Sequence, residues 1–322
     1  MLVQTDPARF RVKHTQDVDA HARNLSAWEQ HYEQTSPGAF CAEVRELFDS
    51  DLQVFEEVAS CATSQQCRTW HGGVWVGLAV TDADTGLRFM GRATHGLQLM
   101  LASGRTPFEL QVPAGCGLYG MVLDQATLAQ HVQALHHHHC PDDWADSPRV
   151  QTLTPLQRYR LAGMVREVLR SLQNQPEALQ HEASRRSLRE ALLTVLSDIL
   201  LPDTLDQAAS PRQQRRQELV HKVRDMVFDC PEQPLSVAEL CVRLHVTRRT
   251  LQNAFQESLG TSPAAFLRTV RLNAVRRALR ERPTQATIAD TAARWGFWHM
   301  GHFSQEYKAL FGETPSQSRR AA

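Results

Sequence analysis

A short helical segment between Leu235 and Gly260 carries polar side chains suited to contacting the edges of nucleic-acid bases. These side chains recur at i, i+3, i+4 and i+7 and therefore share one helix face. They are Arg249, Gln252, Asn253 and Gln256. Arginine can form two hydrogen bonds to guanine, and asparagine or glutamine can form two to adenine. The alternative is an ordinary solvated face, where mostly Glu and Lys are expected; because this face holds no acid, we favour DNA.

Two helices and a turn are predicted to position this face. Ser236 and Glu239 form a capping box, which predicts a helix beginning at Val237. Thr247 can cap a second helix, and Gly260 can end it. The pattern is that of a helix-turn-helix unit.

An internal repeat predicts a second such unit. With an offset of 52 residues, the apolar stripe of the second helix recurs, and so does the terminator, because Gly260–Pro263 becomes Gly312–Pro315. The polar face maps onto Gly301, Ser304, Gln305 and Lys308. We expect the first three to contact bases together with the four residues of the first unit.

A helix predicted between Pro263 and Arg282 joins the two units. At about 1.5 Å per residue it is roughly 28 Å long. Successive major-groove faces lie roughly 34 Å apart, so one chain could place both recognition helices in adjacent grooves. Basic residues around these helices are expected to neutralise phosphates: Arg248, Arg268, Arg271, Arg276, Arg277 and Lys308.

Charge is unevenly divided along a chain whose formal net charge is zero. Residues 211–322 hold 18 Lys and Arg against 10 Asp and Glu, and residues 1–210 hold 17 against 25. A basic C-terminal third is typical of a nucleic-acid-binding module attached to an acidic partner domain. A chance excess on a solvated surface is the alternative that charge alone leaves open.

The N-terminal two thirds are predicted to be a separate sensor and coupling domain, residues 1–205. Short strand-like runs at 38–124 indicate an antiparallel sandwich or barrel. Helical periodicity follows over about 125–201. A linker is expected at 206–213, and the DNA-binding domain at 214–322. The fold class is therefore α+β with two domains, the second one all-α.

The double unit resembles the AraC/XylS-type transcriptional activators over roughly residues 213–320. The motifs that carry the resemblance are Thr247-x-x-x-Leu251-x-x-x-Phe255, Gly260-x-Ser-Pro263, Arg271-Leu-x-x-Ala274, Ala293-x-x-Gly296-Phe297 and Phe303-x-x-x-Tyr307. The chain departs from the family pattern at His245, His299 and Gln305. The resemblance implies a cupin-like N-terminal sensor, double-stranded DNA and RNA polymerase as partners, and a possible homodimer.

A narrower resemblance, to regulators of ethanolamine-utilisation operons, extends into the N-terminal half. It is carried by the segments at 25–40, 51–57, 244–255, 271–279 and 295–307. It implies activation of a catabolic operon with ethanolamine as effector, and adenosylcobalamin as co-effector by resemblance only. Regulators of other amine and alcohol catabolic operons share parts of these segments, so a different operon of that kind stays open.

Aromatic side chains in the strand region are candidates for an effector pocket. They are Trp70, Trp75, Phe89 and Phe108. An apolar wall with few polar groups is typical of a small-molecule site. Aromatic residues on strands also serve as plain core, and that interpretation stays beside the first.

No metal site and no enzymatic activity are predicted. The run from His136 to Cys140 contains residue types that bind zinc. Adjacent histidines, however, point in different directions on any regular element, so they do not form a site together. Two alternatives remain from other classes of protein. One is a cupin-type metal-dependent enzyme fused to a DNA-binding domain, and the other is a constitutive architectural DNA binder.

The chain is expected to be cytoplasmic, with no membrane partner. The first residues lack the apolar segment of a signal peptide, and no apolar run approaches the length of a membrane span. Seven scattered cysteines without a C-x-x-C pair suit reduced thiols better than a disulfide framework.

Overall fold

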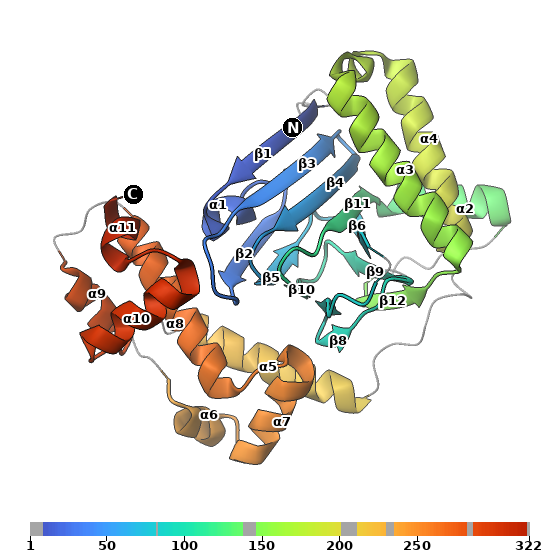
Figure 1. Cartoon of the computed structure of the whole chain (residues 1–322). Coiled ribbons are helices and arrows are strands. Elements are labelled where there is room, and N and C mark those ends of the chain that lie inside the picture. Colours follow the sequence, from blue (N-terminus) through green and yellow to red (C-terminus); the bar gives the residue numbers. More distant parts are fainter. Residues whose placement is uncertain are drawn as a thin grey trace, which may run out of the picture.

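A β-rich N-terminal domain, three covering helices and an all-helical C-terminal domain follow one another along the chain (Figure 1). The computed structural model describes residues 9–81, 83–137, 146–200, 211–229, 235–281 and 286–320. None of the helices in these ranges is both long and apolar enough to cross a lipid bilayer.

Two antiparallel sheets form the N-terminal domain within the described residues. The larger sheet has the order β1 (Arg9–Thr15), β3 (Ala42–Phe48), β4 (Leu52–Ala59), β11 (Leu118–Asp124), β6 (Gly73–Ala79), β9 (Gln98–Ser103) and β12 (Arg149–Thr152). The smaller sheet has the order β2 (Glu29–Gln34), β5 (Thr63–Arg68), β10 (Phe108–Val112), β7 (Arg88–Phe89) and β8 (Arg92–Ala93). The predicted β-region is confirmed, and β1, β2 and β12 extend it beyond the predicted bounds.

The two sheets pack face to face as a β-sandwich, with one apolar core between them. Because side chains alternate along a strand, Phe108, Leu110 and Val112 of β10 enter this core while Glu109 and Gln111 face outward. The pattern makes the outer surface of the smaller sheet polar.

The four aromatic residues expected to line an effector pocket lie in or beside this core. Trp75, Phe89 and Phe108 are buried, and the rings of Trp75 and Phe108 stack with centroids 4.5 Å apart. Trp70 is half-buried and packs edge-on against Phe48. These contacts give the rings a packing role.

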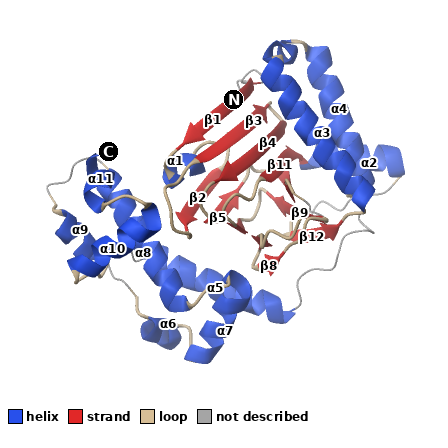
Figure 2. Cartoon of the chain, in the orientation of Figure 1, coloured by secondary structure: helices blue, strands red, loops and turns tan. Residues whose placement is uncertain are grey.

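Helices α2 (Gln125–His136), α3 (Pro155–Asn174) and α4 (Glu182–Ile199) cover the other face of the larger sheet (Figure 2). They lie within the span of about 125–201 where helical periodicity is expected, with β12 between α2 and α3. Their apolar stripes enter a second core with the larger sheet. The C-terminal domain lies on the opposite side of the sandwich (Figure 1), so these helices do not separate the two domains.

Seven helices make up the described part of the C-terminal domain. They are α5 (Pro211–Asp229), α6 (Val237–Arg243), α7 (Arg248–Leu259), α8 (Pro263–Arg280), α9 (Ile288–Arg294), α10 (Met300–Phe311) and α11 (Pro315–Arg320). Helix α8 supplies Phe266 and Val270 to one small core and Val275 and Leu279 to another. The two helix-turn-helix units therefore share one continuous helix, as the sequence predicts. Of the predicted linker, residues 206–210 lie outside the described residues and α5 begins at Pro211.

Candidate nucleic-acid interface

Helix α7 presents the predicted polar face to solvent. Leu251, Ala254 and Phe255 are buried against α5 and α8, which fixes the opposite side of the helix outward. All four predicted base contacts on this helix are exposed: Arg249, Gln252, Asn253 and Gln256. Arg248, expected to contact phosphate, is exposed in the first turn.

Local hydrogen bonds hold α7 in place. The Thr247 hydroxyl accepts from the Thr250 amide at 3.1 Å, and Gly260 ends the helix in a left-handed conformation with φ of 67°. The capping box of α6 forms as predicted, because the Ser236 amide donates to the Glu239 carboxylate at 2.7 Å. The turn between the helices passes through His245 with φ of 52°.

Helix α10 repeats this arrangement in the second unit. Phe303 and Tyr307 are buried, whereas Gly301, Ser304, Gln305 and Lys308 are exposed on the other side. His299 caps the helix through Nδ1, which accepts from the His302 amide at 3.2 Å.

Trp298, in the turn before α10, is 88% exposed and is not among the residues expected from the sequence to contact DNA. A large exposed indole beside a recognition helix is the one signal that would have brought it into the predicted interface. Its position beside α10 allows the indole ring to make an apolar contact with a nucleic acid bound at that helix.

The two units are fixed to each other by more than the chain. The Arg268 guanidinium on α8 pairs with the Glu306 carboxylate on α10, with Nε and Oε2 2.7 Å apart. The Arg271 guanidinium donates to the Leu235 carbonyl oxygen at 2.6 Å, so it links α8 to the start of the first unit. Two of the predicted phosphate contacts thus have partners inside the domain.

This domain matches a known family. Residues 240–321 match the helix-turn-helix domain family. Over 90 residues the chain is 42% identical to the probable thc operon regulatory protein of Rhodococcus erythropolis. The matched region is 28% of this chain and 27% of that protein. It is 31% identical over 87 residues to the XylDLEGF operon transcriptional activator of Pseudomonas putida, covering 27% of each.

A solved structure resembles the same part of the chain. It is that of a probable AraC family transcriptional regulator from Rhodopseudomonas palustris, 32% identical, covering 32% of this chain and 97% of that one, with a TM-score of 0.31. Residues 240–321 thus carry a helix-turn-helix domain, and the C-terminal domain that contains them is called the AraC-type domain below, after the name given to that structure. The chain spans about a quarter of the length of the two curated relatives, 27% of each.

The AraC-type domain is docked on the N-terminal domain through arginines of α8. Arg276 is only 3% exposed, and its Nη1 lies 2.6 Å from Oδ2 of Asp17. Arg277 pairs with Glu33 at 2.7 Å and with Asp19 at 3.2 Å. In this arrangement the guanidinium groups of these two predicted phosphate contacts face carboxylates of the N-terminal domain.

Burial and ion pairing act in opposite directions on this contact. Burial by itself raises the pKa of Asp17, but the charges of Arg276 and Arg280 and the hydrogen bonds from Ala20 and Arg276 together outweigh it, so the net pKa is below its usual value. Burial likewise lowers the pKa of Arg276, and the carboxylates of Asp17 and Glu313 reverse that effect. Both groups therefore stay charged in the interface.

Reciprocal hydrogen bonds complete the docking. The Gln34 amide donates to Oδ1 of Asn273 at 3.1 Å, and Nδ2 of Asn273 donates to the Gln34 carbonyl oxygen at 3.0 Å. The Gln34 side chain also donates to the Leu310 carbonyl oxygen at 2.6 Å. Strand β2 is thereby bonded to both α8 and α10.

A second set of ion pairs and hydrogen bonds joins the two domains at the other end of the interface. Arg224 of α5 pairs with Glu109 of β10 at 2.5 Å and donates to the Ser64 hydroxyl at 2.8 Å. Burial by itself raises the pKa of Glu109, but the charges and hydrogen bonds of Arg224 and His221 together outweigh it, so the pKa is lowered. Nδ1 of His221 lies 3.3 Å from the same carboxylate. Neither set of contacts was predicted from the sequence, because the paired residues are distant from each other in the chain.

The histidine run that suggested zinc is only partly described. His136 ends α2 with Nε2 3.2 Å from Oδ1 of Asp198, and His137 follows in a left-handed conformation. His138, His139 and Cys140 lie outside the described residues. Among the residues described, no group of three or more His, Cys, Asp or Glu side chains has a metal-binding arrangement.

Proposed function

We propose that the chain is a sequence-specific DNA-binding regulator that activates a catabolic operon in response to a small effector. The observation that carries the proposal is the pair of exposed polar faces on α7 and α10, which are joined by one rigid helix. Arg, Asn and Gln on such faces have the chemistry needed to distinguish base pairs. As an activator it would act through RNA polymerase, alone or as a homodimer.

Residue roles follow from exposure. Arg249, Gln252 and Asn253 with Gln256 are proposed to contact bases in one groove, and Gly301, Ser304 and Gln305 in the next. Arg248 and Lys308 are proposed to contact phosphates directly, because both are exposed and flank these faces. Arg276 and Arg277 would reach phosphate only after leaving their carboxylate partners.

We propose that the N-terminal sandwich is the sensor and that the regulated operon serves amine or alcohol breakdown, with ethanolamine as the first effector to test. Among the described residues, four cavities at the domain interface have volumes of about 300, 380, 420 and 320 Å³. A molecule of ethanolamine's size fits such a space, and a corrinoid does not. Adenosylcobalamin therefore enters the test only as a separate addition.

The test is selection of genomic fragments by the purified full-length protein. We expect recovery of one or a few promoters, with occupancy or transcription in vitro that changes when ethanolamine is added. Ethanolamine ammonia-lyase genes beside the promoter would support the narrow proposal, and other amine or alcohol genes would replace the effector. Binding of all fragments alike would refute sequence-specific regulation and favour an architectural role.

A further inference from the structure

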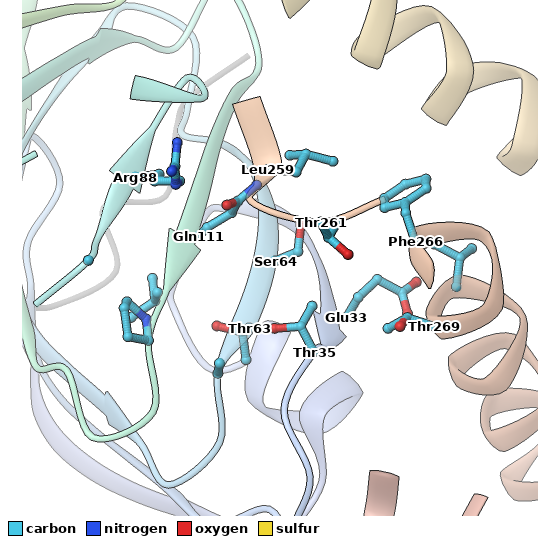
Figure 3. A pocket seen from close by; sticks show the side chains of 15 residues that line it. Glu33, Thr35, Thr63, Ser64, Arg88, Gln111, Leu259, Thr261, Phe266 and Thr269 are labelled. Carbon is cyan, nitrogen blue, oxygen red and sulfur yellow. The ribbon is translucent and has the colours of Figure 1, made fainter. Parts of the chain in front are cut away.

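A cavity of about 300 Å³ lies between the outer face of the smaller sheet and the AraC-type domain (Figure 3). Its volume is at the lower end of the range usual for small-molecule sites. One wall comes from β2, β5, β7 and β10, and the other from the end of α7 and the first half of α8. A molecule bound there would touch both domains.

The sheet side of the cavity is a single polar row. Register pairs Glu33 with Ser64, Ser64 with Gln111, and Gln111 with Arg88, so these four residues are neighbours across four strands. All four line the cavity. Strands lie about 4.8 Å apart, which places a carboxylate at one end of the row and a guanidinium roughly 14 Å away at the other.

The opposite wall is mostly apolar. Leu259, Phe266 and Val270 line it, together with the hydroxyl-bearing side chains of Thr261 and Thr269. Thr261 follows directly after Gly260, the residue that ends recognition helix α7. Contact at this wall therefore acts on the helix that carries Arg249.

Glu33 is the unusual member of the row. It is 5% exposed, and its Oε1 lies 2.7 Å from Nη2 of Arg277 and 2.8 Å from Nε2 of His31. Its Oε2 is buried with no hydrogen-bond donor. A buried acceptor without a donor is unfavourable, and more so when it is charged.

The surrounding ion-pair cluster lacks a positive charge. Among the described residues, Glu33 and Asp19 both pair with Arg277, so two carboxylates face one guanidinium group. The neighbouring ion pairs of Asp17 and Glu313 with Arg276 and Arg280 form a separate, balanced group. His31 supplies a second positive charge to the Glu33 group only when it is protonated. One more cation beside Glu33 would balance the cluster.

We propose that this cavity binds a small protonated amine, whose ammonium group donates to Oε2 of Glu33 and whose remainder lies between the polar row and Phe266. Because this oxygen is buried, binding requires a side-chain movement that opens it to the cavity. The proposal rests on the proposed function in one respect, because this amine would be the effector.

An anionic ligand is disfavoured by the state of Arg88. Its Nη1 donates to the carbonyl oxygen of Glu257 at 2.7 Å and to that of Gly91 at 3.3 Å. Arg88 is thus already used to hold the end of α7 against the sheet. The polar atom without a hydrogen-bond partner is Oε2 of Glu33, at the other end of the row.

Calorimetry on the full-length protein without DNA tests the site. The probes are ethanolamine, propylamine and methylamine, with propionate and 1-propanol as the anionic and neutral controls. We expect at least one amine to bind with 1:1 stoichiometry and neither control to bind. Glu33→Gln should weaken binding of the amine at least about tenfold. Thr269→Phe, which fills the cavity and leaves the carboxylate, should also weaken it.

Glu29→Gln is the matched control. It removes an exposed acid from the same strand, where Glu29 pairs with Arg68, and it should leave amine affinity unchanged. Binding of propionate in place of every amine, failure of all three amines at 10 mM, or amine binding insensitive to both Glu33→Gln and Thr269→Phe would each overturn the proposal. Because no DNA is present, failure here leaves promoter selection intact, and loss of promoter selection leaves amine binding measurable.

Discussion

Arg249 is the proposed base contact whose loss should be easiest to detect in binding data. A bidentate contact to one guanine would distinguish it from a phosphate contact. We expect Arg249→Ala to weaken binding to the selected operator by roughly 1–3 kcal/mol and to relax preference at one base position. Affinities for the operator and its single-base variants measure both effects. Unchanged selectivity would remove Arg249 from the base-contacting set.

Arg276 is expected to behave differently because it is buried beside Asp17 and Glu313. Removing one partner of a buried ion pair destabilises a protein by about 3–5 kcal/mol. Arg276→Ala should therefore lower the free energy of unfolding and loosen the two domains, which urea denaturation and limited proteolysis measure.

Asp17→Asn separates this structural effect from contact with DNA. It breaks the same pair and keeps the guanidinium group. If Arg276 also contacts a phosphate, Arg276→Ala should reduce the salt dependence of binding by about one unit of slope, and Asp17→Asn should not. Equal slopes for both variants would confine Arg276 to the domain interface.

At the scale of elements, regular periodicity was enough to predict α2, α3, α4 and the helices of both helix-turn-helix units. Caps fixed their ends, as the boxes at Ser236 and Thr287 show. Strand β2 was not predicted, because its outward residues His31 and Glu33 are polar although the AraC-type domain covers them. The chain alone carries no local pattern for a contact between residues 240 positions apart.

The candidate interface, too, was predicted only where it depends on local spacing in the sequence. The exposed faces of α7 and α10 follow from local spacing and were predicted residue by residue. The docking of Arg276 and Arg277 was not, because a basic residue on a helix looks the same whether its partner is a phosphate or a distant carboxylate. The cavity beside Glu33 depends on register between four strands, which no single segment specifies.

The turn between α6 and α7 offers a test at this scale. His245 adopts φ of 52°, whereas the second unit has Gly296 with φ of 81° at the matching place. Left-handed backbone disfavours residues with a Cβ by about 1–2 kcal/mol, and the extra freedom of unfolded glycine offsets about 0.5–1 kcal/mol of this. His245→Gly should therefore raise the free energy of unfolding by up to about 1 kcal/mol in urea denaturation.

Gly296→Ala is the reciprocal variant, and it should lower the free energy of unfolding by about 1 kcal/mol. A loss of stability on His245→Gly would mean that the imidazole makes a compensating contact.

At the scale of the whole molecule, docking of the two domains should depend on pH through His221. Hydrogen bonding to Glu109 raises the pKa of His221 above its ordinary 6.5; burial opposes this, and the charges of Glu109 and Asp225 add to it while Arg224 subtracts. A raised pKa means that protonation favours the docked state. The contribution is complete below about pH 6.5 and is lost as the pH rises through the pKa of the docked state.

Protection of the interface from proteolysis should thus be greater at pH 6 than at pH 8.5. His221→Gln should remove most of this difference, while the exposed His302→Gln should not. A difference that survives His221→Gln would assign the pH dependence to another group.

Helix α8 has one more consequence, for the DNA rather than for the protein. It enters both small cores, and Arg268 ties it to Glu306, so the two recognition helices cannot slide or rotate independently. Inserting one base pair between two half-sites moves them apart by about 3.4 Å and turns them by roughly 35°. A flexible tether would absorb that change. This chain should instead demand a fixed phase between half-sites, so operators in a genome could be recognised by their spacing as well as by their bases.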